Sequence, residues 1–330
     1  MSLLKVTGLK KHFPVYGGIF YRQIKTVYAL DGIDLEVNPG EVVGLVGESG
    51  CGKSTAGRTI MRLQDPTSGT IEFEGRDIST LDESDMRKVR PDIQMIFQDP
   101  FESLNPRHSI GDILEEPFIV HGVGTPAERK KWVLELLDKV GLSPSYAARY
   151  PHEFSGGQRQ RIGIARAIAL KPKLIICDEP VSALDVSIQS QVINLLLDLQ
   201  KEMNLSYVFI AHDLAVVKHI SDRIAVMYLG KIVELADADD IYKMPLHPYT
   251  QALISAIPVP DPTRKKQRTA LKGDVPSPIN PPSGCSFHTR CPFAKDICKT
   301  KEPSLNELAT MPGSGKRKVA CHFAEDFIKS

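Results

Sequence analysis

The segment Gly47-Glu-Ser-Gly-Cys-Gly-Lys-Ser54 fits the pattern G-x-x-x-x-G-K-[ST] and is the starting point for inferring the fold. It lies between a continuously apolar, strand-like run, VVGLVGE, and a helix-like run, TAGRTIMRLQ. Glycines let the backbone wrap closely around phosphates, and the start of the next helix adds free N–H groups. Lys53 is long enough to reach the β- and γ-phosphates, and Ser54 offers a hydroxyl to Mg²⁺. We therefore predict a nucleotide-binding loop with Mg²⁺.

Two further apolar runs read as buried parallel strands, LIICD (174–178) and YVFIAHD (207–213), and a periodic helix candidate (186–203) lies between them. Strands that alternate with helices predict an α/β fold with a parallel sheet. Residues 3–10 and 26–46 alternate as strands do. The segment from about 100 to 170 is mostly helical in pattern and is expected to be an inserted helical subdomain.

Composition limits the classes of function. The 330 residues carry 41 Lys and Arg against 40 Asp and Glu, so we expect no nucleic-acid partner. No apolar run approaches the ~18 residues of a membrane span, and the Met1 region has no signal-peptide core, so we expect neither insertion nor export by that route. Proline and charge increase after about residue 258. We therefore expect a nucleotide-binding domain over 1–257 and an extension over 258–330 with an extended linker and no core of its own.

Asp178 and Glu179 end the strand LIICD, where open α/β sheets place ligands. Asp178 is suited to holding Mg²⁺ through its water shell, and Glu179 to polarising an attacking water as a general base. A strand that merely ends in solvated carboxylates is the alternative. The phosphate loop makes that alternative the weaker one.

Ser155-Gly-Gly-Gln158 precedes the helix pattern RQRIGIARAIAL. Ser155 is a good N-cap, and the two glycines leave N–H groups open to an anion. The alternative interpretation is an ordinary N-cap that follows a turn and binds no anion. Gln98, which ends MIFQ, and His212, which closes the third strand run, are weak signals when each is taken alone.

Together these residues resemble the ATP-binding cassette (ABC) family over about residues 3–250. GESGCGKS is similar to its Walker A motif, FSGGQ to its signature, and LIICDE to its Walker B motif. Gln98 takes the position of the Q-loop glutamine, Ser182–Asp185 that of the D-loop, and His212 that of the switch histidine. Phe154 stands where leucine is commonest in the family, and both are apolar.

The resemblance implies a RecA-like parallel-sheet core, an antiparallel β subdomain and the inserted helical subdomain. It also implies two cassettes packed head to tail, with each ATP between one chain's phosphate loop and the other chain's signature. Phe13 fits the aromatic that stacks on adenine, with Tyr16 and Tyr28 as alternatives. The implied catalytic residues are Glu179 and His212, and Mg²⁺ would be held by Ser54, Gln98 and Asp178. The implied ATP contacts are Phe13, Gly47, Glu48, Ser49, Gly50, Cys51, Gly52, Lys53, Ser54, Thr55 and Gln98, and the signature contacts to the partner's ATP are Ser155, Gly156, Gly157 and Gln158.

Four of the six cysteines lie near the C-terminus with the spacing C-x5-C-x6-C-x22-C, namely Cys285, Cys291, Cys298 and Cys321. Four thiolates can hold Zn²⁺ or an iron–sulfur cluster. Zinc frameworks usually have tighter C-x2–4-C pairs, which are absent here, and four unrelated cysteines are a further alternative. Cys51 and Cys177 have simpler explanations, since one lies in the phosphate loop and the other in a buried strand.

The runs HPYTQALISAIP, PSPINPPSGCSFHTRCP and VACHF resemble the C-terminal extension of dipeptide and oligopeptide importer cassettes, a group that includes some nickel and glutathione importers. The resemblance implies a [4Fe-4S] cluster on the four tail cysteines, with Zn²⁺ as the alternative and a structural or redox-regulatory role left open. It implies an ATPase that powers peptide import from the cytoplasmic face of the membrane. Its partners would be a second cassette, more often a different chain, two membrane-spanning permeases and an extracytoplasmic peptide-binding protein. Soluble cassette ATPases of ribosomes or DNA usually have two cassettes in one chain or a long coiled-coil insertion, and neither is seen in this sequence.

Overall fold

A computed structural model describes residues 2–99, 103–257, 271, 273–308 and 317–328. The chain divides into two compact units. The first unit comprises Met1–Glu36, Val42–Ser79 and Ala211–Ser330, and the second comprises Val37–Glu41 and Thr80–Ile210. The phosphate loop and the described part of the C-terminal extension therefore belong to the same unit.

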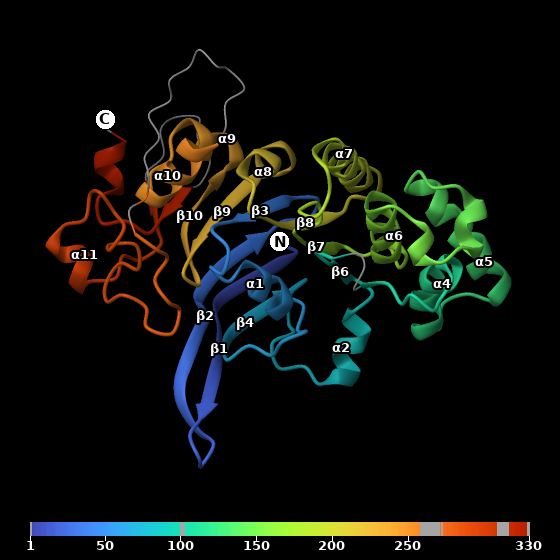
Figure 1. Ribbon diagram of the computed structural model, residues 1–330, viewed down its shortest axis with the longest axis horizontal. Coiled ribbons are helices and arrows are strands. Elements are labelled where there is room, and N and C mark those ends of the chain that lie inside the picture. Colours follow the sequence, from blue (N-terminus) through green and yellow to red (C-terminus); the bar gives the residue numbers. More distant parts are fainter. Residues whose placement is uncertain (1, 100–102, 258–270, 272, 309–316, 329–330) are drawn as a thin grey trace. The chain divides into compact units, whose positions relative to one another are not determined.

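The first unit contains a four-stranded antiparallel sheet in the order β2-β1-β4-β5. Its strands are β1 (Leu4–Gly17), β2 (Arg22–Val37), β4 (Ser68–Phe73) and β5 (Arg76–Asp77). β1 and β2 form a long hairpin (Figure 1). Leu4 and Val6 are buried and pair with Phe73 and Ile71 of β4, as the alternating pattern predicts.

A second sheet of the first unit has the order β11-β12-β10-β9-β3. β3 (Val42–Val46) runs parallel to β9 (Arg223–Tyr228), and β10 (Lys231–Asp237) pairs antiparallel with β9. Every residue of β3 is buried, as its continuous apolar run predicts. The helices of this unit are α1 (Lys53–Ile60), α8 (Leu214–Ile220), α9 (Ala238–Lys243), α10 (Pro248–Ala256), α11 (Asp296–Thr300) and η3 (Ala324–Phe327).

The C-terminal extension contributes strands to this sheet. β12 (Arg317–Val319) pairs antiparallel with β10, and β11 (Asn306–Leu308) pairs with β12. Phe287 and Val319 are 1% and 2% exposed, so the extension buries apolar side chains in the first unit. The described residues of the extension thus pack against another part of the first unit, with the edge of β10 as the partner, which composition did not predict. The expected linker falls largely on residues 258–270 and 272, outside the described part of the chain.

The second unit contains parallel strands in the order β8-β7-β6. These are β6 (Ile93–Ile96), β7 (Leu174–Asp178) and β8 (Ser206–Ala211, of which Ser206–Ile210 lie in this unit). Between β6 and β7 the described chain is helical, as its pattern predicts. The helices of the unit are α2 (Glu83–Val89), α4 (Ile110–Val120), α5 (Pro126–Lys139), η1 (Pro144–Ala148), η2 (Pro151–Glu153), α6 (Gly156–Ile168) and α7 (Val186–Met203).

Among the described helices, none has both the length and the apolar character needed to cross a membrane.

Candidate nucleotide-binding site

The phosphate loop joins β3 to α1 in the first unit. Lys53 begins α1 and is 5% exposed. Its Nζ donates hydrogen bonds to the carbonyl oxygens of Gly47 at 2.8 Å and Glu48 at 3.1 Å. The lysine therefore lies across the loop, where its ammonium group is positioned to meet an anion that the loop binds.

Two glycines of the loop occupy positions that no side chain can share. Gly52 has φ 107°, and a Cβ there would lie 2.3 Å from the carbonyl oxygen of Ala29. Gly47 has φ 156°, and its Cβ would lie 2.2 Å from the carbonyl oxygen of Met227. Backbone atoms cannot move aside as a flexible side chain can, so both positions require glycine.

The C-terminal half of the first unit holds Glu48 of the loop. The N–H of Glu48 donates to Tyr249 Oη at 2.8 Å. Arg290 donates from its two terminal nitrogens to the two Glu48 carboxylate oxygens, at 2.6 and 3.0 Å. Tyr249 and Arg290 lie 201 and 242 residues from Glu48, and no sequence signal linked them to the loop.

The expected adenine-stacking residue, Phe13, lies half-buried on β1. The ammonium of Lys11 is 4.9 Å from the centroid of its ring. Of the two alternatives, Tyr28 packs edge-on against His12 at 4.7 Å, and Tyr16 stacks on Tyr21 at 5.2 Å. Both alternatives thus have aromatic neighbours, whereas the recorded ring contact of Phe13 is with a cation.

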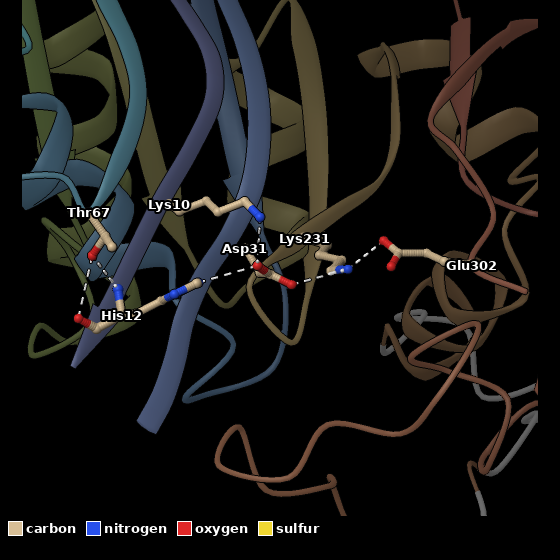
Figure 2. Close-up of polar contacts among 6 residues, drawn as sticks. All are labelled: Lys10, His12, Asp31, Thr67, Lys231 and Glu302. Carbon is tan, nitrogen blue, oxygen red and sulfur yellow. Dashed lines mark hydrogen bonds and ion pairs between the residues drawn. The ribbon is translucent and has the colours of Figure 1, made fainter. Parts of the chain in front are cut away.

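A charged network anchors this part of β1, and Figure 2 shows its members. Asp31 of β2 contacts Lys10 at 3.5 Å, His12 at 3.3 Å and Lys231 at 3.3 Å. Lys231 also forms an ion pair with Glu302 of the extension. Burial alone would raise the pKa of Asp31, but Lys231 and Lys10 hold it below its usual value. The extension is therefore linked to the strand that carries Phe13.

In the second unit, the structure brings Gln98 and Glu179 together. Gln98 Nε2 donates to Glu179 Oε2 at 3.2 Å across 81 residues of sequence. Glu179 has φ 46°, a left-handed conformation unusual for glutamate, and its N–H donates to the carbonyl oxygen of Ile210 at 3.0 Å. Asp178 ends β7 and is 1% exposed. A buried carboxylate beside a strained, positioned one is typical of a functional site.

The D-loop segment follows directly. The hydroxyl and the N–H of Ser182 both donate to the carbonyl oxygen of Glu179, at 3.1 and 3.2 Å. Asp185 is the N-cap residue of α7. These contacts hold the turn in which Glu179 takes its left-handed conformation.

The signature segment begins α6. Ser155 is its N-cap, and a reciprocal capping box joins Ser155 and Gln158, as predicted for the cap. A Cβ on Gly157 would lie 2.5 Å from Cγ2 of Ile188 in α7, so close helix packing is a second reason for that glycine. Ser155 and Gly156 are exposed. Phe154 is buried and packs edge-on against Tyr146 at 5.4 Å.

His212 lies in the first unit, exposed, directly after β8 and before the Asp213 cap of α8. Gln98, Asp178, Glu179 and the signature lie in the second unit, and the phosphate loop and Phe13 in the first.

All four tail cysteines line one small cavity of the first unit, together with His247 and Phe287. All six cysteines of the chain are free thiols; Cys177 is buried, as expected of its strand, and Cys51 is buried as well. Burial raises the pKa of Cys285 and of Cys321 to about 11. Among the residues with a described position, no group of three or more His, Cys, Asp or Glu side chains is arranged to hold a metal ion. The four cysteines thus share a cavity, and the cluster itself stays a prediction.

Comparisons with known proteins agree with this geometry. The ABC transporter family model matches residues 30–182, and the model of the oligopeptide/dipeptide transporter C-terminal region matches residues 233–298. The chain is 58% identical over 327 residues to the oligopeptide transport ATP-binding protein AppF of Bacillus subtilis, covering 97% of each chain. It is 53% identical to a probable peptide ABC transporter ATP-binding protein of Sinorhizobium fredii, covering 97% of this chain and 90% of the relative.

A solved structure also shares the fold, a dimeric ATP-binding cassette in a post-hydrolysis state bound to ADP and Pi. It has a TM-score of 0.64 and 31% identity, and the match covers 71% of this chain and 98% of that one. The chain therefore belongs to the family of ABC transporter ATP-binding proteins, in the group that carries the oligopeptide/dipeptide transporter C-terminal region.

Proposed function

We propose that this chain is the ATP-hydrolysing subunit of an importer of dipeptides and oligopeptides. The observation that carries the proposal is one compact unit in which a phosphate loop, crossed by Lys53, is bonded to the C-terminal region typical of peptide transporters. The names of relatives such as AppF support peptides as the cargo. Import of nickel or glutathione by the same ATPase remains the alternative cargo assignment.

We propose the nucleotide-site residues that the family motifs indicate. The loop Gly47–Thr55 would bind the phosphates through its backbone N–H groups, and Phe13 would stack on the adenine. Ser54, Gln98 and Asp178 would hold Mg²⁺, which when bound neutralises phosphate charge. A buried carboxylate, a hydroxyl and an amide oxygen are ligands that Mg²⁺ accepts.

For hydrolysis, Glu179 is the proposed general base. Its carboxylate would take a proton from the attacking water as the water oxygen bonds to the γ-phosphorus and the bond to the β-phosphate oxygen breaks. The hydrogen bond from Gln98 and the strained turn at Glu179 support this role because they fix the orientation of the carboxylate. His212 would contact the γ-phosphate from the first unit.

A head-to-tail pair of cassettes is proposed for turnover. In that pair Ser155, Gly156, Gly157 and Gln158 would meet the ATP held by the partner's phosphate loop. The exposed start of α6 supports the assignment, because a helix N-terminus favours an anion. The partner would be a second, different cassette chain. Both would act at the cytoplasmic face of the membrane, on two permease subunits served by an extracytoplasmic peptide-binding protein.

We also propose the domain boundaries of the chain. Residues 1–257 would form the nucleotide-binding domain, with the helical subdomain at about 100–170, and residues 258–330 the extension. In the extension, Cys285, Cys291, Cys298 and Cys321 would hold a [4Fe-4S] cluster, with Zn²⁺ as the alternative. Their common cavity and free thiols support a thiolate site. Iron, sulfide and zinc analysis of protein purified without oxygen separates the cluster, zinc and metal-free outcomes.

Substitution of the proposed base tests the ATPase mechanism. Glu179→Gln keeps the size and loses the base, so we expect ATP binding to be retained and turnover to fall by about 10²–10⁴-fold. Glu36→Gln, at an exposed position of β2, is the control and should hydrolyse ATP at the wild-type rate. Near wild-type turnover in Glu179→Gln would refute the assignment.

Cargo is tested in cells that lack the gene. Labelled dipeptide and oligopeptide uptake should return with the wild-type chain and not with Glu179→Gln. Restored uptake of nickel or glutathione, with no peptide uptake, would replace the peptide assignment.

A further inference from the structure

Arg290 of the extension makes the most specific contact between the cysteine-bearing tail and the phosphate loop. We propose that Arg290 is a positioning residue for ATP binding, acting through Glu48. This inference rests on the proposed ATPase function and adds to it a residue outside the motifs of the cassette. Arg290 directly precedes Cys291, so the segment that lines the cysteine cavity also reaches the loop.

The burial of Arg290 and the geometry of its two hydrogen bonds show that the contact is specific. The Arg290 side chain is 6% exposed and that of Glu48 is 28% exposed. Two parallel hydrogen bonds of 2.6 and 3.0 Å join them in the fork geometry that only arginine provides. The guanidinium carbon also lies 5.9 Å from the ring centroid of Tyr228. A buried guanidinium is tolerated only with such partners, which makes Glu48 its required counter-charge.

The main chain of Glu48 is held at both ends by other residues. Its N–H donates to Tyr249 Oη, and its carbonyl oxygen accepts from Lys53 Nζ. Tyr249 is fully buried and is backed by Phe287 of the extension, with ring centroids 5.4 Å apart. Arg290 bonds the side chain as well, so both the main chain and the side chain of the second loop residue have partners in the first unit. A loop residue that is ordered before phosphate binds loses less entropy on binding.

The charge of Arg290 also favours ATP binding. Glu48 places a carboxylate within a loop whose expected ligand is a polyanion, and like charges at short range repel. Arg290 neutralises that carboxylate. Both effects act on ATP affinity and not on proton transfer at Glu179, so loss of Arg290 should raise the KM for ATP and leave kcat nearly unchanged.

The experiment measures the Kd for ATP by calorimetry, with and without Mg²⁺, and steady-state ATPase kinetics on the full chain. Arg290→Gln should weaken ATP binding about 10- to 100-fold, the range expected for hydrogen bonds to a charged group. Arg290→Lys keeps the charge and loses the two parallel hydrogen bonds, so its Kd for ATP should lie between the values for the wild type and for Arg290→Gln. In a Glu48→Gln background, Arg290→Gln should change Kd less than threefold, because the residue through which Arg290 acts is no longer charged.

A buried arginine of the extension with a different partner provides the matched control. Arg317 has the same 6% side-chain exposure and pairs with Glu234 of β10 instead of the loop. Arg317→Gln should lower the thermal midpoint and leave the Kd for ATP within twofold of wild type. An unchanged Kd in Arg290→Gln, or equal losses in Arg290→Gln and Arg317→Gln, would overturn the inference. A wild-type chain that binds ATP without hydrolysing it would instead refute the proposed function and leave the Kd comparison valid.

Discussion

Docking of the extension onto β10 is predicted to depend on one buried ion pair. Glu234 is 0% exposed, and its carboxylate accepts from Arg317 Nε at 3.2 Å and from the terminal nitrogen of Arg317 at 2.5 Å. It also accepts the N–H groups of Leu246 and His247, each at 2.9 Å. Arg317→Met would leave a buried carboxylate with no counter-charge. The expected loss is about 3–5 kcal/mol, the range measured when one partner of a buried pair is removed.

Hydrogen exchange is the suitable assay because the extension can open while other parts stay folded. A loss of about 3–5 kcal/mol corresponds to exchange that is roughly 100- to 4000-fold faster wherever opening of the extension limits it, at about 1.4 kcal/mol per tenfold change. Amides of 231–237 and 317–319 should show the change, and those of β7 should not. Lys318→Met in the same strand removes the same charge and should leave exchange unaltered. Exchange in Arg317→Met within threefold of wild type would refute this account of docking.

Two further predictions concern single side chains. Gly157→Ala places a Cβ 2.5 Å from Ile188, so overpacking should lower the free energy of urea unfolding by about 1–3 kcal/mol. In the control, Gly156→Ala, the nearest atom is on Leu184 at 3.5 Å, and the free energy of unfolding should not fall. Equal unfolding midpoints for the two variants would show that α7 can shift. Burial lowers the pKa of His247 from about 6.5 in the unfolded chain to about 3. The stability that the neutral imidazole contributes is therefore complete above pH 6.5 and is lost as the pH falls from about 6.5 towards 3. The free energy of unfolding should fall by up to about 1.4 kcal/mol per pH unit in this range. His247→Asn keeps an N-cap acceptor for α10 and should flatten that pH dependence, and an unchanged slope would assign it to other groups.

The local motifs were predictable from the sequence because their physics is local. The N-cap at Ser155 was predicted and is present, and the structure adds a capping box with Gln158 within the same helical turn. The buried strand before Gly47 is a run of apolar residues, and every residue of β3 is buried. The four tail cysteines were expected to share one metal or cluster site, and they line one cavity. Among the described residues, however, no group of three or more His, Cys, Asp or Glu side chains is arranged to hold a metal ion.

The packing partner of the extension was not predictable from its sequence. Its proline-rich and charged composition predicted no core of its own, and in the structure β12 pairs with β10 and Phe287 is 1% exposed. Composition reports what a segment can bury by itself. It does not report an unpaired strand edge elsewhere in the chain that can accept a short strand such as Arg317–Val319.

The sequence by itself determined the nucleotide-binding loop, the N-cap of the signature helix and the individual buried strands, since each depends on residues that are close together in the chain. Tertiary structure alone decided what surrounds them. The contact of Arg290 with Glu48 spans 242 residues, and that of Gln98 with Glu179 spans 81. No periodicity in a chain encodes a pair at such a separation, because the pairing depends on how strands and loops are brought together in space after each has formed.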